Sequence, residues 1–240
     1  MSRGIFIIGT DTEVGKTVVS AGLMHLLLGN KYKAAYFKPV ASGQVLLGGS
    51  YQSADASFVK TVSGFAEEQK NITPFSFTNA VAPHFAARLE ARSIDLAVIK
   101  DRLQYLKDHY DFIIAEGAGG LAVPLNDQGF MQHDLIRELG FPCLLVCRTG
   151  LGTINHTLLT LRFAKSEGLA IKAILMNGNR QTDIETDNIE TIRKLSGVPA
   201  IFTVSALAGV DTETLQPGNI AEVFESNIDI NEIIGLMESI

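Results

Sequence analysis

The residues best suited to do chemistry begin at the end of an apolar run, Ile5–Ile8. The run leads into Gly-Thr-Asp-Thr-Glu-Val-Gly-Lys-Thr, which starts at Gly9 and ends at Thr17. Backbone N–H groups of such a glycine-bounded loop, at the start of a helix, bind nucleotide phosphates. Lys16 would reach the β- and γ-phosphates, and the Thr17 hydroxyl would bind Mg²⁺. The loop therefore predicts chemistry that starts from a nucleoside triphosphate.

The spacing of this loop differs from the general phosphate-binding pattern. Five residues separate Gly9 from Gly15, where the general pattern has four. The context is the required one, because an apolar strand precedes the loop and a helical segment follows it. The alternative is an ordinary strand–turn–helix corner that carries Gly-Lys-Thr by chance.

A lysine at the end of a second apolar strand is the next candidate. Lys38 lies in residues 37–43, Phe-Lys-Pro-Val-Ala-Ser-Gly, directly after that strand. Ligands of open α/β sheets bind outside the carboxyl ends of the strands, so this ammonium would point into the nucleotide crevice. It could hold a transferring phosphoryl group or a carboxylate-like intermediate. A surface lysine at a strand end is the equal alternative.

Carboxylates for a metal ion are offered at two further positions. Glu116 ends the run Ile-Ile-Ala-Glu and precedes Gly-Ala-Gly-Gly, as in a Walker B strand whose acid holds Mg²⁺. The alternative is a simple turn after a strand. Asp55 could supply a second carboxylate, although an acid in a first helical turn is also favoured by the helix dipole.

A second glycine-rich approach to a helix lies at residues 149–156, Thr-Gly-Leu-Gly-Thr-Ile-Asn-His. Such an approach is a possible anion site. The plainer alternative is that Thr153 caps the helix. The two cysteines, Cys143 and Cys147, fall on one face of an apolar strand and are interpreted as core residues rather than as a redox or metal pair.

The elements that must position these residues alternate along the chain. Short apolar runs without polar alternation indicate strands that are buried on both faces of a parallel sheet. The expected strands are Gly4–Ile8, Ala34–Phe37, Phe112–Ala115, Cys143–Cys147, Ala173–Met176 and Ala200–Val204. The expected helices are Lys16–Leu28, Ala54–Val62, Pro83–Arg92, Ile94–Tyr105, Asp134–Leu139, Thr153–Glu167, Ile184–Leu195 and Ile230–Met237. The glycine-rich segment Ala41–Ser53 is expected to be a functional or mobile loop.

This alternation predicts an α/β fold with a doubly wound, mainly parallel sheet, in one domain over residues 1–240. The chain has 46% hydrophobic residues and a net charge of −6, which disfavours nucleic acid as a partner. No apolar run approaches membrane-spanning length, and no signal-peptide pattern opens the chain. We therefore expect a cytoplasmic protein with no membrane partner.

Taken together, the motifs resemble those of the dethiobiotin synthetase family within the P-loop NTPases. Four blocks carry the resemblance, in the family's order and across most of the chain. They are residues 9–17, residues 38–43 (Lys-Pro-Val-Ala-Ser-Gly), residues 116–120 (Glu-Gly-Ala-Gly-Gly) and residues 151–156 (Leu-Gly-Thr-Ile-Asn-His). The five-residue interval in the first loop is the family's own form.

The resemblance implies an ATP- and Mg²⁺-dependent cyclo-ligase of biotin biosynthesis. An amine of 7,8-diaminononanoate would take up CO₂, supplied as such or as bicarbonate, to give a carbamate. ATP would phosphorylate the carbamate to a carbamic–phosphoric anhydride, and the second amine would close the ring to dethiobiotin with release of ADP and phosphate. Members of the family are homodimers, so a homodimer is expected.

The resemblance also implies a role for each matching residue. Lys16 and Lys38 would be catalytic, and Thr17, Asp55 and Glu116 would surround Mg²⁺. The other nucleotide contacts would come from Glu13, Val14, Gly15, Val18, Gly117, Ala118, Gly119 and Asn177. The substrate would meet Thr12, Lys38 and Ser42, and its distant carboxylate would meet Gly152, Thr153 and Asn155.

The chain departs from the family pattern at three places. Gly178 follows Asn177 where the family often has an acid next to the base. Residues 182–196 contain no tyrosine, although some members use one from the neighbouring subunit on the substrate carboxylate. The chain has no Trp, and Ser205-Ala206-Leu207 stands where a Pro-Trp pair often lies.

Two other functions fit parts of this pattern. The N-terminal parts of cobyrinic and cobyric acid amide synthases resemble the same fold, but those enzymes add a glutamine-hydrolysing domain for which 240 residues leave no room. A partner-regulated ATPase switch is the rival from another class. Partitioning ATPases of this kind carry an extra lysine early in the phosphate loop, whereas this chain has Thr10-Asp11-Thr12.

Overall fold

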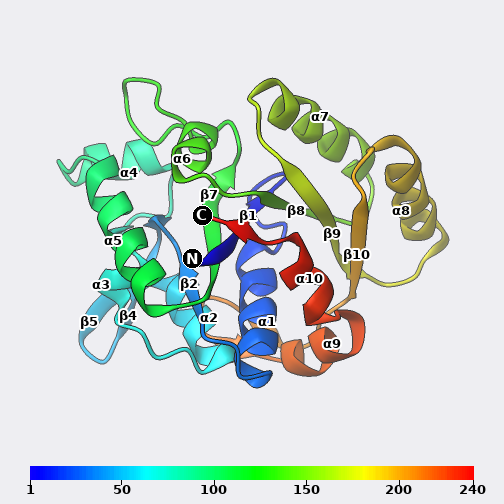
Figure 1. Cartoon of the computed structure of the whole chain (residues 1–240), viewed down its shortest axis with the longest axis horizontal. Coiled ribbons are helices and arrows are strands. Elements are labelled where there is room, and N and C mark those ends of the chain that lie inside the picture. The colour runs from blue at the N-terminus through cyan, green and yellow to red at the C-terminus, as the bar shows by residue number, and fades with distance from the viewer.

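The computed structural model describes all residues from 1 to 240 and is built around one parallel sheet (Figure 1). Its strand order is β10-β9-β8-β1-β7-β2, and a short seventh strand, β13, pairs antiparallel with the start of β1. These strands are β1 (Arg3–Gly9), β2 (Ala34–Phe37), β7 (Phe112–Gly120), β8 (Cys143–Arg148), β9 (Ile171–Asn179), β10 (Ala200–Ser205) and β13 (Glu238–Ser239). The six expected strands are thus confirmed, and the sheet is mainly parallel as expected.

Helices cover both faces of the sheet. They are α1 (Lys16–Gly29), α2 (Ala54–Ser63), α3 (Gln69–Ile72), α4 (Pro83–Leu89), α5 (Leu96–His109), α6 (Gln132–Leu139), α7 (Thr153–Ser166), α8 (Asp183–Leu195), α9 (Ile220–Asn227) and α10 (Ile230–Leu236). In Figure 1, α1, α9 and α10 lie together below the sheet, while α6 and α7 lie above it. The expected helices all exist, with ends that differ by up to four residues, while α3 and α9 were not expected from the sequence.

Most strands of the sheet are apolar and buried on both sides, whereas the edge strand β10 is mostly half-buried. Residues 4–9 of β1 are all buried, and so are all four residues of β2. A single cluster of 57 buried hydrophobic residues runs through the sheet and its helices. Full burial explains why these strands show no polar alternation in the sequence.

The chain winds outward from β1 in both directions. The first crossover, through α1, leads toward the β2 edge, and the later strands β8, β9 and β10 extend the sheet on the other side. The strand order therefore reverses beside β1, and ligands of such sheets bind at the carboxyl ends of the strands near that point. This places the loop after β1 where a binding crevice is expected.

The expectation of an irregular loop at Ala41–Ser53 is wrong. The segment forms β3 (Val40–Ser42), which pairs with β6 (Phe75–Phe77), and an antiparallel hairpin of β4 (Gln44–Leu47) with β5 (Ser50–Ser53). Gly48 and Gly49 form the turn, with φ values of 56° and 83°. A two-residue Gly-Gly turn with two positive φ angles is a strong hairpin signal, because it matches the twist of the flanking strands. A second small ribbon joins β11 (Val210–Asp211) to β12 (Gln216–Pro217).

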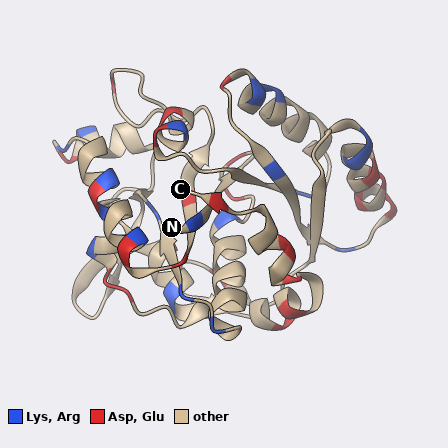
Figure 2. Cartoon of the chain, in the orientation of Figure 1, with Lys and Arg blue, Asp and Glu red and all other residues tan.

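Charged residues of both signs are interleaved on several helices, whereas α9 and α10 carry acidic residues alone. Figure 2 shows the interleaving clearly along α5, which carries Lys100, Asp101 and Arg102 in succession. No helix of the chain is both long enough and apolar enough to cross a membrane.

Candidate active site

The phosphate-binding loop joins β1 to α1 and is held in shape by a neighbouring strand. Gly15, the residue before α1, has a φ of 96°, and a Cβ there would lie 2.1 Å from Asn177 Nδ2. Only glycine fits this approach and this backbone conformation. Asn177, at the end of β9, donates from Nδ2 to the Val14 carbonyl oxygen at 3.1 Å. The loop is therefore braced from β9 before any ligand binds.

Lys16 is a buried lysine without a direct carboxylate partner. Its Nζ donates to the Asp11 carbonyl oxygen of its own loop at 2.9 Å, and its side chain is only 7% exposed. Burial, and then repulsion from Lys38, lowers the pKa of Lys16 to about 8, despite the more distant attraction of Glu116, Asp55 and Asp11. A buried ammonium that lacks a counter-ion is poised to gain from an anionic ligand.

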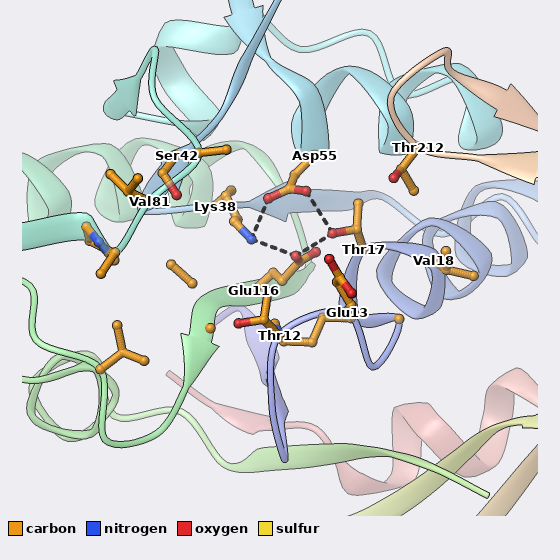
Figure 3. A pocket seen from close by; sticks show the side chains of 18 residues that line it. Thr12, Glu13, Thr17, Val18, Lys38, Ser42, Asp55, Val81, Glu116 and Thr212 are labelled. Atoms are coloured by element: carbon orange, nitrogen blue, oxygen red, sulfur yellow. Dashed lines mark hydrogen bonds and ion pairs between the residues drawn. The ribbon is translucent and has the colours of Figure 1, made fainter. Parts of the chain in front are cut away.

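Lys38 lies between two carboxylates in the centre of the site (Figure 3). Its Nζ is 2.7 Å from Asp55 Oδ2 and 2.7 Å from Glu116 Oε1, and it also donates to the Gly117 carbonyl oxygen at 3.0 Å. Burial by itself would lower the pKa of Lys38, but Asp55 and Glu116 outweigh it and hold the pKa above its ordinary value. The alternative of a surface lysine at a strand end is therefore wrong, because Lys38 is buried in the site.

Each carboxylate comes from a different element. Asp55 is the second residue of α2, whose cap is Ser53, so it is an acid in a first helical turn and a member of the site at once. Burial would raise its pKa, but contact with Lys38 and Thr17 lowers that pKa below the ordinary value. Glu116 is fully buried within β7, which continues to Gly120. The alternative of a simple turn after the strand is therefore wrong, since residues 116–120 extend the strand.

The donor set fits a hard divalent cation. Thr17 Oγ1 lies 2.9 Å from Asp55 Oδ1 and 2.8 Å from Glu116 Oε1. The Thr17 hydroxyl has one proton and can donate to only one of these two carboxylate oxygens at a time. Its short distance to the second carboxylate oxygen is therefore not explained by a hydrogen bond. Carboxylate and hydroxyl oxygens are the ligands that Mg²⁺ prefers. Thr17, Asp55 and Glu116 could thus hold Mg²⁺ together.

A cavity of about 600 Å³ opens over these groups and reaches from the loop to α4. Most of the residues predicted from the sequence line it. They are Thr12, Glu13, Gly15, Lys16, Thr17, Val18, Lys38, Ser42, Asp55, Glu116, Ala118 and Gly119. The fold thus gathers three separate sequence blocks and Asp55 around one space.

Other predicted residues lie outside this lining. Val14 is buried behind the loop, and Gly117 contributes its carbonyl oxygen to Lys38. The residues 152–155 belong to the start of α7, where Gly152 is the cap with a φ of 87°. Thr153 is the first helical residue and donates to the Arg148 carbonyl oxygen at 2.6 Å, so the alternative of a Thr153 cap is wrong. Within one chain, the cavity does not include this helix start.

Sequence reasoning missed several residues of the site. The lining also includes Ala80, Val81, Ala82, Pro83, Val123 and Thr212. Pro83 gave a signal only for the start of α4, and Thr212 follows the short strand β11. Tyr36, fully buried in β2, donates its hydroxyl to Glu116 Oε2 at 2.9 Å. Its position two residues before Lys38, on the same face of the strand, is the signal that could have found it.

Comparison with known protein families gives one match over most of the chain. A family model described as an AAA domain matches residues 3–214. The ATP-dependent dethiobiotin synthetase BioD of Clostridium kluyveri is 40% identical over 219 residues, covering 90% of this chain and 91% of that protein. The enzyme of the same name from Clostridium acetobutylicum is 36% identical, covering 99% and 100%, and that from Bacillus subtilis is 38% identical, covering 89% and 91%.

Solved structures with the same fold include ATPases of a different kind. The cell division ATPase MinD of Pyrococcus furiosus aligns with a TM-score of 0.63 at 19% identity, covering 98% of this chain and 100% of that one. MinD of Pyrococcus horikoshii in complex with Mg-ADP aligns with a TM-score of 0.58 at 18% identity, covering 98% and 96%. At this identity the likeness shows the fold alone, and it confirms the predicted P-loop NTPase architecture. The sequence relatives decide the family, and this chain belongs to the ATP-dependent dethiobiotin synthetases, which are ligases.

Proposed function

We propose that this protein forms the cyclic urea of dethiobiotin from 7,8-diaminononanoate, CO₂ and ATP. The observation that carries the proposal is the gathering of Lys16, Thr17, Lys38, Asp55 and Glu116 around one cavity. A phosphate-binding loop, a metal-binding set and a second buried lysine are the parts that phosphorylation of a carbamate requires. The printed names of the relatives point to ATP-dependent dethiobiotin synthesis, and the diamine substrate is the one that the resemblance of the motifs implies.

The proposed reaction has three steps. One amine of the diamine adds to CO₂ and loses a proton, which gives a carbamate. A carbamate oxygen then attacks the γ-phosphorus of ATP. This step releases ADP and forms a carbamic–phosphoric anhydride. The second amine attacks the carbonyl carbon of that anhydride, loses a proton and expels inorganic phosphate as the ring closes. Positioning and charge neutralisation carry phosphoryl transfer, so the protein has little covalent chemistry to supply.

The two lysines divide the anionic groups between them. Lys16, whose ammonium has no carboxylate in contact, would hold the β- and γ-phosphates. Lys38 would hold the carbamate and the transferring phosphoryl oxygens. Preorganised cations in a buried site stabilise developing negative charge far better than water does.

Thr17, Asp55 and Glu116 are the proposed magnesium-holding residues. A divalent cation held by these three side chains would supply positive charge that offsets the negative charge of the transferring phosphoryl group. Glu13, Val14, Gly15, Val18 and the strand end Gly117–Gly119 would contact the nucleotide. Asn177, whose Nδ2 donates to the Val14 carbonyl oxygen at 3.1 Å, is proposed to contact the base.

Thr12 and Ser42 also line the cavity, and we propose that they contact the substrate. The start of α7 at Gly152, Thr153 and Asn155 remains the proposed site for the distant carboxylate of the substrate. The protein is proposed to act as a cytoplasmic homodimer, a state that light scattering of the purified protein would test.

The test is phosphate release from Mg-ATP in the presence of 7,8-diaminononanoate and bicarbonate, with each omitted in turn. We expect release to need both, with dethiobiotin formed in equal amount. Release that ignores the diamine would contradict the proposal. It would favour the ATPase switch instead.

A further inference from the structure

The two oxygens of the Glu116 carboxylate have different hydrogen-bond partners, and one of these partners is the hydroxyl of Tyr36. Glu116 Oε1 faces the cavity and contacts the Thr17 hydroxyl at 2.8 Å and Lys38 Nζ at 2.7 Å. Glu116 Oε2 faces the core and accepts from the Tyr36 hydroxyl at 2.9 Å. Each oxygen therefore has its own set of partners, and Tyr36 is the one partner of the oxygen that points away from the site.

The sheet fixes this contact through strand register. Tyr36 pairs with Ile114 in the parallel ladder of β2 and β7, and Phe37 pairs with Ala115. Lys38 and Glu116 are each two residues beyond the first pair, so their side chains fall on the same face as Tyr36. The long Tyr36 side chain spans the diagonal from its own register position to the carboxylate.

Both groups lie where neither water nor another donor can replace the contact. Tyr36 and Glu116 are each 0% exposed, and Tyr36 is part of the hydrophobic core. A buried carboxylate oxygen without a donor is strongly disfavoured. Without the hydroxyl, Glu116 would turn to seek another donor and take Oε1 away from Thr17 and Lys38.

We propose that Tyr36 is a positioning residue that orients Glu116 for the metal ion and, through the same carboxylate, for Lys38. This inference rests on the proposed function of Glu116 as a magnesium-holding residue. Groups that hydrogen-bond to metal ligands commonly fix ligand orientation, and their removal weakens metal affinity or activity about 10- to 100-fold. Tyr36 acts through Glu116 and has no contact with the substrate of its own.

The chain offers a matched control in Tyr110. Its hydroxyl donates to Glu67 Oε2 at 2.8 Å, so it makes the same kind of bond to a glutamate. Neither Tyr110 nor Glu67 lines the cavity. Tyr110→Phe thus removes one tyrosine–glutamate hydrogen bond while leaving the site intact.

The experiment titrates Mn²⁺ as the metal probe into wild type, Tyr36→Phe and Tyr110→Phe in the presence of ADP, followed by electron paramagnetic resonance. We expect the Mn²⁺ Kd to rise about 10- to 100-fold in Tyr36→Phe and to stay unchanged in Tyr110→Phe. In dethiobiotin synthesis, the Mg²⁺ concentration for half-maximal rate should rise in parallel, and excess Mg²⁺ should recover much of the rate. Equal Mn²⁺ affinity in the two variants would overturn the inference.

Two further measurements keep these outcomes separate. If Tyr36→Phe folds poorly, Tyr36→Met also lacks the hydroxyl, and the rise in Tm that Mn²⁺ and ADP cause in each variant serves as an internal comparison. A reduced rise in the Tyr36 variants supports the inference, and an unchanged rise opposes it. If wild type binds Mn²⁺ but forms no dethiobiotin, the proposed function fails, while the binding data still decide the role of Tyr36.

Discussion

The ends of β1 and β2 each present a buried lysine to the same cavity, yet the two lysines are in opposite electrostatic states. Lys16 follows β1 and touches only a carbonyl oxygen of its own loop, and burial lowers its pKa to about 8. Lys38 follows β2 and touches two carboxylates, which hold its pKa above the ordinary value although it is at least as buried. Burial therefore does not set the charge of a lysine, because direct carboxylate contact can outweigh it.

The difference separates two uses of a positive charge. Lys16 is kept without a counter-ion, so an arriving phosphate is the first strong anionic partner it meets. Lys38 already contacts Asp55 and Glu116, the two carboxylates that are proposed to hold Mg²⁺. The ammonium and the metal ion would therefore share these ligands. Lys16 is thus available to an anionic ligand, whereas Lys38 reduces the repulsion between Asp55 and Glu116.

Replacing Lys38 should have the largest effect on activity, and it tests directly whether the two lysines differ. In Lys38→Met we expect dethiobiotin formation to fall by about 10³-fold or more, because a preorganised cation at the transferring group is lost. Asp55 and Glu116 would also face each other without a cation. The free energy of unfolding without Mg²⁺ should fall by about 3 kcal/mol, toward the low end for a broken buried pair, since the Asp55 side chain is 30% exposed.

The measurements for Lys38→Met are product formation and thermal unfolding with and without Mg²⁺. We expect Mg²⁺ to restore much of the lost stability, since it would replace the missing positive charge. Lys100→Met is the control, because Lys100 pairs with Glu138 at 2.7 Å on the surface, where such a pair contributes about 0–1 kcal/mol. A stability loss no larger than that of the control would contradict the role given to Lys38.

Replacing Lys16 should change the free energy of unfolding in the opposite direction to replacing Lys38. In Lys16→Met we expect the rate with ATP to fall about 100-fold, because the cation at the β- and γ-phosphates is lost. The free energy of unfolding at pH 7 should rise by up to about 2 kcal/mol, because a buried ammonium without a counter-ion is removed. Chemical denaturation of both lysine variants in one buffer would show the difference, and a loss of stability like that of Lys38→Met would argue against it.

The smallest expected effect is a pH dependence that only Lys16 should confer. Burial lowers the pKa of Lys16 to about 8, and we expect bound phosphates to favour the ammonium and to raise that pKa in the complex. The complex therefore binds more protons than the free protein above pH 8, so ADP affinity should fall as pH rises, by up to about tenfold per unit.

Calorimetric titration of ADP between pH 7 and 9.5 would measure this dependence. Proton uptake on binding, seen as a heat that varies with the buffer, should appear near pH 8 and above. An affinity that stays level across this range would show that Lys16 keeps its proton in the free protein. Lys38 should contribute nothing to the profile, because its pKa lies far above the range.

The strands and their order of appearance were predictable because full burial leaves a plain signal. An unbroken apolar run such as Ile5–Ile8 is typical of a strand that is buried on both faces. The hairpin Gln44–Ser53 was missed because its strands are short and half exposed, so their pattern is weak. The Gly48-Gly49 turn was the stronger signal there, and it was interpreted as irregular.

Within the site, the lysines, Thr17 and Glu116 could be selected from the sequence because each belongs to a compact motif. Tyr36, Val123 and Thr212 could not, because their place depends on register and packing between segments far apart in the chain. The start of α7 shows the reverse case, since its motif is clear but a single chain leaves it outside the cavity.

The sequence by itself determined the chemistry available: a loop for phosphates, two lysines at strand ends, and carboxylates for a metal ion. Only the tertiary structure decided how charge is shared among them. It placed Lys38 between Asp55 and Glu116, left Lys16 without a carboxylate, and put the Tyr36 hydroxyl behind Glu116. The reason is physical, since electrostatic interactions and hydrogen bonds depend on distance and burial, and these are set by packing between elements rather than by spacing along the chain.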